Sequence, residues 1–151
     1  MKEKPVKRRR LQHLSLNRMI PNILTLLAVA SGLTAMRFAF QERWEHAVLA
    51  IVVAAVFDAL DGRIARLLKG ASKFGAELDS LSDFVCFGVA PAMILYLWAM
   101  QDAGRAGWLL AMLFAMCCGL RLARFNVATE DENLPAWKAN FFTGVPAPAG
   151  G

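Results

Sequence analysis

Four long apolar stretches, separated by short polar segments, divide this chain of 151 residues. They run over residues 20–40, 47–68, 75–100 and 107–125. A helix needs about 20 predominantly apolar residues to cross a bilayer. The second stretch is apolar only in its first half, so we expect residues 58–66 to emerge at the polar boundary. The pattern predicts an all-α fold, a polytopic bundle of four membrane-spanning helices.

Smaller signals place individual features on these helices. Pro21 suits the first turn of the first helix, and Pro91 is expected to kink the third. Residues 101–106, which include Asp102 and Gly104, are expected to form a tight hairpin. The first helix also carries a face of small residues suited to close helix packing: Ser31, Gly32, Thr34 and Ala35.

The composition divides the chain into three parts. Residues 1–19 form a basic juxtamembrane segment that is expected to lie along the membrane surface. Residues 20–126 form the transmembrane core. Residues 127–151 are expected to be a polar loop followed by the entry to a fifth helix.

Basic residues are distributed unevenly among the segments that connect the helices. They gather at the N-terminus, between the second and third helices, and after the fourth helix. Because cytoplasmic segments carry an excess of lysine and arginine, we expect both termini and the polar end of the second helix in the cytoplasm. Trp44, Trp98 and Trp108 then fall at the opposite interface, as aromatic belts do. The pattern predicts a multi-pass protein of the cell (inner) membrane, with the polar end of its second helix facing the cytoplasm.

The composition supports a membrane protein and argues against other classes. Hydrophobic residues make up 57% of the chain, and charged residues only 19%. The net charge of +5 is concentrated at the N-terminus. Beside a spanning segment, such a basic run favours membrane lipid over nucleic acid as a partner. Cys86, Cys117 and Cys118 lie in apolar segments without the spacing of a zinc site, so they are expected to be reduced core residues.

Four aspartates lie in the facing ends of the second and third stretches, at Asp58, Asp61, Asp79 and Asp83. Residues three or four apart share one face of a helix, so the first two share one stripe and the last two another. Small residues beside them would let the two helices approach closely, which would bring the four carboxylates together. Oxygen ligands gathered in this way suit Mg²⁺ or Mn²⁺. We expect Asp58, Asp61 and Asp79 to hold two divalent ions, with Asp83 placed to complete the site.

Two other interpretations of the aspartates are open. Acids at this spacing often form only the solvated face of a surface helix, but these adjoin apolar runs, where acids tend to face an interior site. A cation transporter could also line its path with such acids. Against a transporter, the acids are predicted to cluster at helix ends, and ion passage does not require the accompanying glycines and arginine.

The spacing around these aspartates resembles the signature of the CDP-alcohol phosphatidyltransferase family. It reads D-x-x-D-G-x-x-A-R, then eight residues, then G-x-x-x-D-x-x-x-D, and is filled by Asp58, Asp61, Gly62, Ala65, Arg66, Gly75, Asp79 and Asp83. The resemblance implies a membrane enzyme, a homodimer, that moves a substituted phosphate from a CDP-linked lipid to an alcohol and releases CMP. Family members have six membrane helices, of which this sequence supplies four and the entry to a fifth.

The resemblance also implies roles for individual residues. Asp83, the last aspartate of the signature, would act as general base on the alcohol, which suits a carboxylate near a metal-organised hydroxyl. Binding of the CDP-lipid would involve Asp58, Gly62, Arg66 and Gly75, with the glycines letting the backbone approach the nucleotide. Arg66 could pair with a phosphate or could instead extend to lipid headgroups.

The acceptor alcohol is suggested by two later motifs. R-L-A-R-F-N at residues 121–126 and G-V-P-A-P-A at residues 144–149 resemble the bacterial branch of the family that uses CDP-diacylglycerol and L-serine. Arg121 and Arg124 share a helix face and could meet a carboxylate or a phosphate, or could serve only as positive-inside anchors. Glycerol 3-phosphate and inositol phosphate therefore stay open as alternative acceptors.

Overall fold

The computed structural model describes residues 16–68 and 72–130, and every regular element within them is a helix. The α-helices are α1 (Leu16–Phe40), α2 (Trp44–Leu67), α3 (Lys73–Asp83), α4 (Ala90–Leu95) and α5 (Arg105–Glu130). Between α3 and α5 lie two π-helical segments, η1 (Phe84–Val89) and η2 (Tyr96–Met100), and the 3₁₀ turn η3 (Gln101–Ala103). The predicted all-α fold is confirmed.

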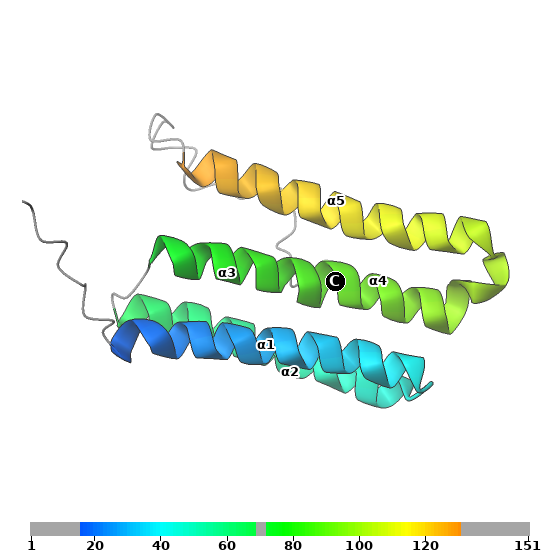
Figure 1. Cartoon of the computed structure of the whole chain (residues 1–151), viewed down its shortest axis with the longest axis horizontal. Helices are drawn as coiled ribbons and strands as arrows, with labels where there is room; N and C mark the ends of the chain where they lie inside the picture. Colours follow the sequence, from blue (N-terminus) through cyan, green and yellow to red (C-terminus); the bar gives the residue numbers. More distant parts are fainter. Residues whose placement is uncertain (1–15, 69–71, 131–151) are drawn as a thin grey trace, which may run out of the picture.

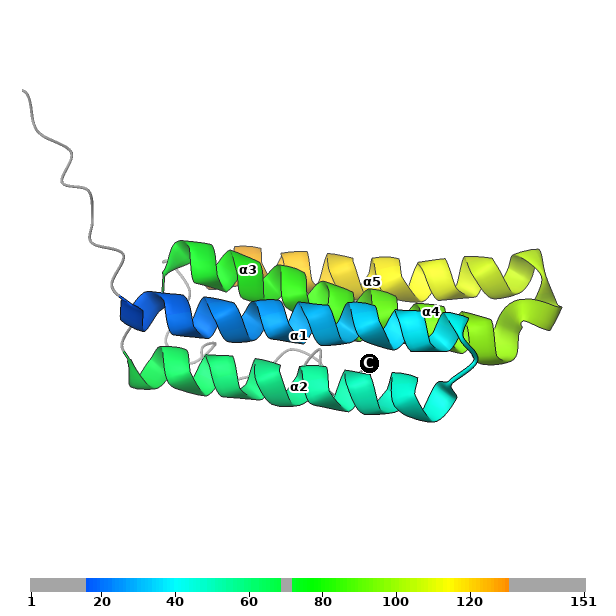
Figure 2. The same cartoon turned by 60° about the horizontal axis from the view of Figure 1, so that its bottom comes forward.

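The elements form a layered bundle of long, roughly parallel rods (Figure 1). Residues Lys73–Ala103 run as one continuous helical rod, which we call the long helix. The first helix, α1, packs against both α2 and the long helix (Figure 2). On its other side the long helix carries α5, which lies apart from the α1–α2 pair (Figure 1). The polar end of α2 and the start of α3 therefore meet beside the N-terminal end of α1.

Within the described residues, three helical segments are long and apolar enough to cross a membrane: Met19–Phe40, Lys73–Ala103 and Arg105–Val127. With 24 residues, α2 is about 36 Å long at 1.5 Å per residue, but its second half is charged. It runs alongside α1 over most of its length (Figure 2). The membrane bundle is thus supported by three helices, and a fourth span through α2 stays a prediction.

Several helix boundaries differ from the sequence-based expectation. Because α1 begins at Leu16, Pro21 lies inside the helix, and its predicted place in the first turn is wrong. Because proline has no N–H, the helix lacks the hydrogen bond from residue 21 to the carbonyl of Asn17. At the other end of the chain, α5 continues through Glu130, so residues 127–130 are helical rather than part of a polar loop. No glycine or proline interrupts the helix there.

The predicted hairpin at residues 101–106 is confirmed. After η3, Gly104 adopts a positive φ of 57°, a conformation that glycine reaches without strain, and α5 starts at the next residue. Pro91 is the second residue of α4, which directly follows the π-helical η1. Most of the basic segment, at residues 1–15, lies outside the described residues. The G-V-P-A-P-A motif at residues 144–149 lies outside them as well.

The interior of the bundle is built from small side chains. One cluster holds Ala28, Ala54, Cys86 and Phe87, and another holds Ala35, Ala39, Ala47 and Ile94. At Gly32 an added Cβ would lie 2.9 Å from the Cys86 Sγ, so α1 and the long helix approach too closely there for a larger residue. The predicted small-residue face is confirmed at Gly32 and Ala35, whereas Ser31 and Thr34 are exposed and bond to their own helix. Large side chains such as Leu26 and Leu113 point outward instead, the arrangement expected in lipid.

Candidate active site

Three of the four aspartates converge from two helices. Asp58 and Asp61 lie one turn apart on α2, and Asp79 lies on α3. Each offers a carboxylate oxygen, and these three oxygens lie within 4.8 Å of one another. Carboxylates this close repel one another unless protons or a cation neutralise them. The structure thus brings together the three residues that the sequence assigned to a metal.

Asp61 is held in a defined position within this cluster. Its side chain is only 3% exposed, and its Oδ2 accepts a hydrogen bond of 2.6 Å from the Thr25 hydroxyl of α1. Thr25 is equally buried, at 3% exposed. A short hydrogen bond to an ionised acceptor is among the stronger polar contacts in proteins. Three helices therefore meet at this carboxylate and its two neighbours.

Asp83 lies one turn beyond Asp79 on α3, outside the group of three. Its carboxyl group faces that of Asp58 within hydrogen-bonding reach. Its Oδ1 is buried and has no hydrogen-bond partner among residues 16–68 and 72–130. Buried carboxylate oxygens are normally satisfied, so an unpartnered one beside three other acids fits a site that a cation or a substrate hydroxyl completes. The acid set and this oxygen fit a hard divalent ion.

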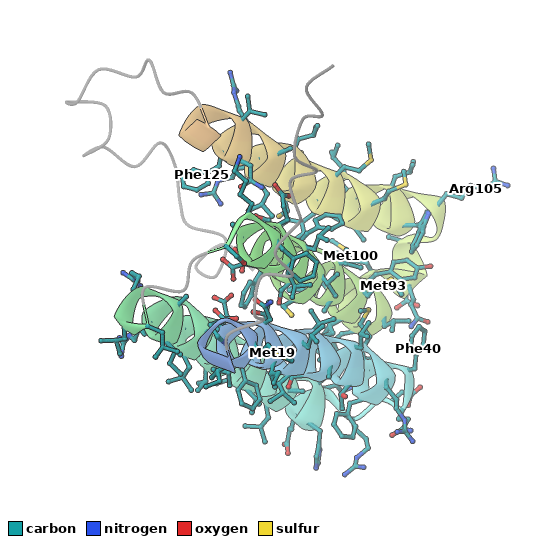
Figure 3. The ribbon with its side chains drawn as sticks, turned by 60° about the vertical axis from the view of Figure 1, so that its left-hand side comes forward. Met19, Phe40, Met93, Met100, Arg105 and Phe125 are labelled. Carbon is teal, nitrogen blue, oxygen red and sulfur yellow. The ribbon has the colours of Figure 1, made fainter. Side chains whose placement is uncertain are left out.

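A cavity of about 180 Å³ opens beside the cluster. Its lining comes from α1, α2 and α3 and comprises Pro21, Asn22, Thr25, Asp61, Gly62, Ala65, Ser72, Gly75, Ala76 and Asp79. The cavity lies toward the end of the bundle that carries Met19 and Phe125, whereas Phe40 and Arg105 mark the far end (Figure 3). A ligand in it would contact Asp61, Asp79 and the first turn of α3.

The two glycines of the signature have different surroundings in this cavity. An added Cβ at Gly75 would lie 3.1 Å from both the Asn22 Oδ1 and the Ser72 Oγ, so this glycine lets α3 pack against α1. The same Ser72 Oγ caps α3 by accepting a 3.0 Å hydrogen bond from the Gly75 N–H. A Cβ added at Gly62 would have no neighbouring atom within 4 Å, so the missing side chain leaves open space. Gly62 therefore adds room to the cavity.

The predicted arginines are not all brought to the site. The exposed Arg66 donates a 3.0 Å hydrogen bond from Nε to the Gly62 carbonyl of its own helix and does not line the large cavity. Arg121 lines a second, smaller cavity of about 30 Å³ together with Asp83. Arg124 is exposed and lines neither cavity. Of the two acceptor-site candidates, only Arg121 lies beside a signature aspartate.

Sequence analysis missed two polar contacts that support the site. One is the Thr25 hydroxyl, for which the signal was a polar residue three positions after Asn22 on an apolar helix. The other joins Ser80 of α3 to Asn126 of α5, whose amide donates a 2.9 Å hydrogen bond to the serine Oγ. The R-L-A-R-F-N motif drew attention to its arginines, while its asparagine makes the contact between helices.

Comparison with known proteins adds a family to this geometry. Residues 18–149 match the family model for CDP-alcohol phosphatidyltransferase. The chain is 46% identical over 131 residues to a CDP-diacylglycerol–serine O-phosphatidyltransferase of Mycobacterium tuberculosis, covering 87% of this chain and 46% of that protein. It is 37% identical over 131 residues to proteins of the same name from Helicobacter pylori and Methanocaldococcus jannaschii, covering 87% of this chain and 53% and 56% of theirs. No solved structure gives a significant match.

The matched range contains the whole helical bundle from Arg18 on and all of the converging aspartates. The chain belongs to the CDP-alcohol phosphatidyltransferase family. It spans about half the length of the three relatives described above.

Proposed function

We propose that this chain forms the catalytic part of an enzyme that transfers a phosphatidyl group from CDP-diacylglycerol to L-serine, giving phosphatidylserine and CMP. The observation that carries the proposal is the convergence of Asp58, Asp61 and Asp79 beside a cavity of about 180 Å³. The names of the relatives support the choice of both substrates.

The aspartates would hold one or two Mg²⁺ or Mn²⁺ ions. Asp58, Asp61 and Asp79 supply converging carboxylate oxygens, and Asp83 supplies the unpartnered oxygen next to them. When bound, such ions neutralise charge on a pyrophosphate and orient the attacking oxygen. The acids alone would repel the pyrophosphate, so the site suits that substrate only with cations present.

Asp83 would accept the proton of the acceptor alcohol. The serine hydroxyl oxygen forms a bond to the phosphorus of the phosphatidyl group, and the bond from that phosphorus to the pyrophosphate bridging oxygen breaks. CMP leaves with the bridging oxygen, and the hydroxyl proton passes to the Asp83 carboxylate. Its partner-free Oδ1 is suited to this role because no hydrogen bond has to break first.

The CDP-lipid would occupy the large cavity, where Gly62 leaves room for the nucleotide next to Asp61 and Asp79, and Gly75 lets α3 approach α1 along the cavity wall. The Arg66 Nε is bonded to the Gly62 carbonyl, so its two terminal nitrogens would be the ones to meet a phosphate. The acceptor would approach Asp83 from the side of Arg121. That cavity, of about 30 Å³, has room for little more than water, so acceptor binding there requires α5 to shift against the long helix.

The surroundings of the enzyme are part of the proposal. Both termini and the aspartate cluster would face the cytoplasm, α2 would cross the cell (inner) membrane with the other three helices, and membrane lipid would cover the exposed apolar side chains. The enzyme would act as a homodimer, as the family resemblance implies. Glycerol 3-phosphate and inositol phosphate are the alternative acceptors, since their phosphate would also suit Arg121.

The test is to incubate the full-length enzyme with CDP-diacylglycerol, Mn²⁺ and each alcohol in turn and to measure CMP release and lipid product. We expect phosphatidylserine with L-serine and little product with the other two alcohols. Product with glycerol 3-phosphate alone would overturn the choice of serine. Uptake of metal into proteoliposomes without CMP release under any condition would favour a cation transporter instead.

A further inference from the structure

Thr25 is a buried polar residue on the apolar helix α1, and its hydroxyl lies between two acceptors. The Asp61 Oδ2 is 2.6 Å away on α2, and the Pro21 carbonyl of its own helix is 3.0 Å away. A threonine hydroxyl has one proton to donate. The shorter contact to a carboxylate is the stronger of the two, so the Thr25 hydroxyl donates its hydrogen bond mainly to Asp61.

Another threonine of α1 shows what a hydroxyl does without such a partner. Thr34 donates a 2.7 Å hydrogen bond to the Ala30 carbonyl, four residues earlier on the same exposed helix face. Thr25 has the equivalent acceptor in Pro21 but also reaches across to α2. The cross-helix contact to Asp61 is therefore specific to position 25.

We propose that Thr25 is a positioning residue for metal binding, which fixes the rotamer of Asp61 so that the carboxylate presents its remaining lone pairs to the cation. The proposal rests on the proposed function, because it assumes that Asp61 is a ligand. One hydrogen bond uses one of about four lone-pair sites of a carboxylate, so the others stay available. Partners that orient a ligand in this way typically alter metal affinity about 10–100-fold when removed.

The backbone of Thr25 also ties α1 to α3. Its carbonyl lies 3.5 Å from the Ser82 hydroxyl, which points toward it from the helix that carries Asp79. Ser82 is itself buried, at 1% exposed. The same residue of α1 thus contacts both aspartate-bearing helices, which places it where it can hold Asp61 in register with Asp79.

The test is an EPR titration of the full-length protein with Mn²⁺ alone, in which the signal of free Mn²⁺ reports binding. Thr25→Val keeps the shape and removes the hydroxyl, and we expect its apparent Kd to rise about 10–100-fold. Thr25→Ser keeps the hydroxyl and should bind like the unmodified protein. Thr34→Val is the matched control on the same helix and should change nothing. At saturating Mn²⁺ the turnover of Thr25→Val should largely recover, because a positioning residue does not take part in the chemistry.

Thermal unfolding of the metal-free variants separates positioning from stability. If Thr25→Val does not fold, Thr25→Ala replaces it in the titration, since alanine is well tolerated in helices. A lowered Tm with unchanged Mn²⁺ affinity in either variant would overturn the proposal. The Asp61→Asn variant separates a failure of the proposed metal site from a failure of the proposed role of Thr25. Unchanged Mn²⁺ binding in Asp61→Asn would contradict the proposed metal site itself, whereas loss in Asp61→Asn without loss in the Thr25 variants would refute only the role of Thr25.

Discussion

Asp83 of α3 and Arg121 of α5 line the same cavity of about 30 Å³, although they lie on different helices. Phe84, Phe87, Gly88, Cys118 and Leu122 complete the cavity. An acid and a base from two helices thereby line one small space between the long helix and α5. This relationship distinguishes Arg121 from Arg124, which the sequence treated alike.

The Asp83→Asn variant should lose most of its turnover. An amide cannot accept the alcohol proton, and loss of general-base catalysis typically costs about 10²–10⁴-fold in rate. Mn²⁺ affinity should fall far less than turnover, because the three converging carboxylates remain and Asp83 lies outside that group. CMP release and Mn²⁺ titration measure the two effects. Asp102→Asn, at an exposed acid in the distant hairpin, is the control, and near-normal turnover in Asp83→Asn would assign the base to another group.

The Arg121→Ala variant should bind the acceptor more weakly. We expect the KM for L-serine to rise at least about tenfold, in line with loss of a charge-assisted hydrogen bond worth about 1.5–3 kcal/mol. The KM for CDP-diacylglycerol should change little, because that substrate is placed in the other cavity. Arg124→Ala is the matched control, one helical turn away and lining neither cavity. Equal effects of the two substitutions on the KM for serine would contradict a specific role of Arg121.

The Ser80–Asn126 hydrogen bond should stabilise the packing of α5 on α3. Asn126→Ala and Ser80→Ala should each lower the free energy of unfolding. The double variant should lose less than the sum of the two single losses, because the hydrogen bond can be broken only once. The coupling is expected to be about 0.6 kcal/mol, the average for hydrogen bonds between membrane helices. A double-mutant cycle by equilibrium unfolding in mixed micelles measures it. Zero coupling would mean that the two side chains act independently.

The two ends of the long helix should face opposite sides of the membrane. Lys73 is exposed at its start, and Asp102 is exposed in the turn at its other end. In right-side-out cells, a membrane-impermeant maleimide should label Asp102→Cys, and should label Lys73→Cys only after permeabilisation. Labelling of Lys73→Cys in intact cells would reverse the proposed orientation. The unmodified protein, with its three cysteines in apolar segments, provides the background.

Local rules in the sequence were enough to predict the helices and the pairs of aspartates. Apolar length predicted the helical segments, the spacing of Asp58 and Asp61 placed both on one face, and Gly104 marked the hairpin. These features depend on neighbours in the chain, whose geometry is fixed by the helix repeat. The start of α1 was misjudged because helical structure extends beyond the apolar stretch, leaving Pro21 inside it.

Contacts between helices were decided only by the tertiary structure. Neither the bond from Thr25 to Asp61 nor the pairing of Ser80 with Asn126 can be read from spacing, because the partners are far apart in sequence. The same holds for Arg121, which the packing of α5 on the long helix brings to Asp83, while Arg124 projects elsewhere. The sequence determined which residues could form a metal-dependent transferase site. The rotation and depth at which the helices pack, set by small residues such as Gly32 and Gly75, determined which side chains meet there.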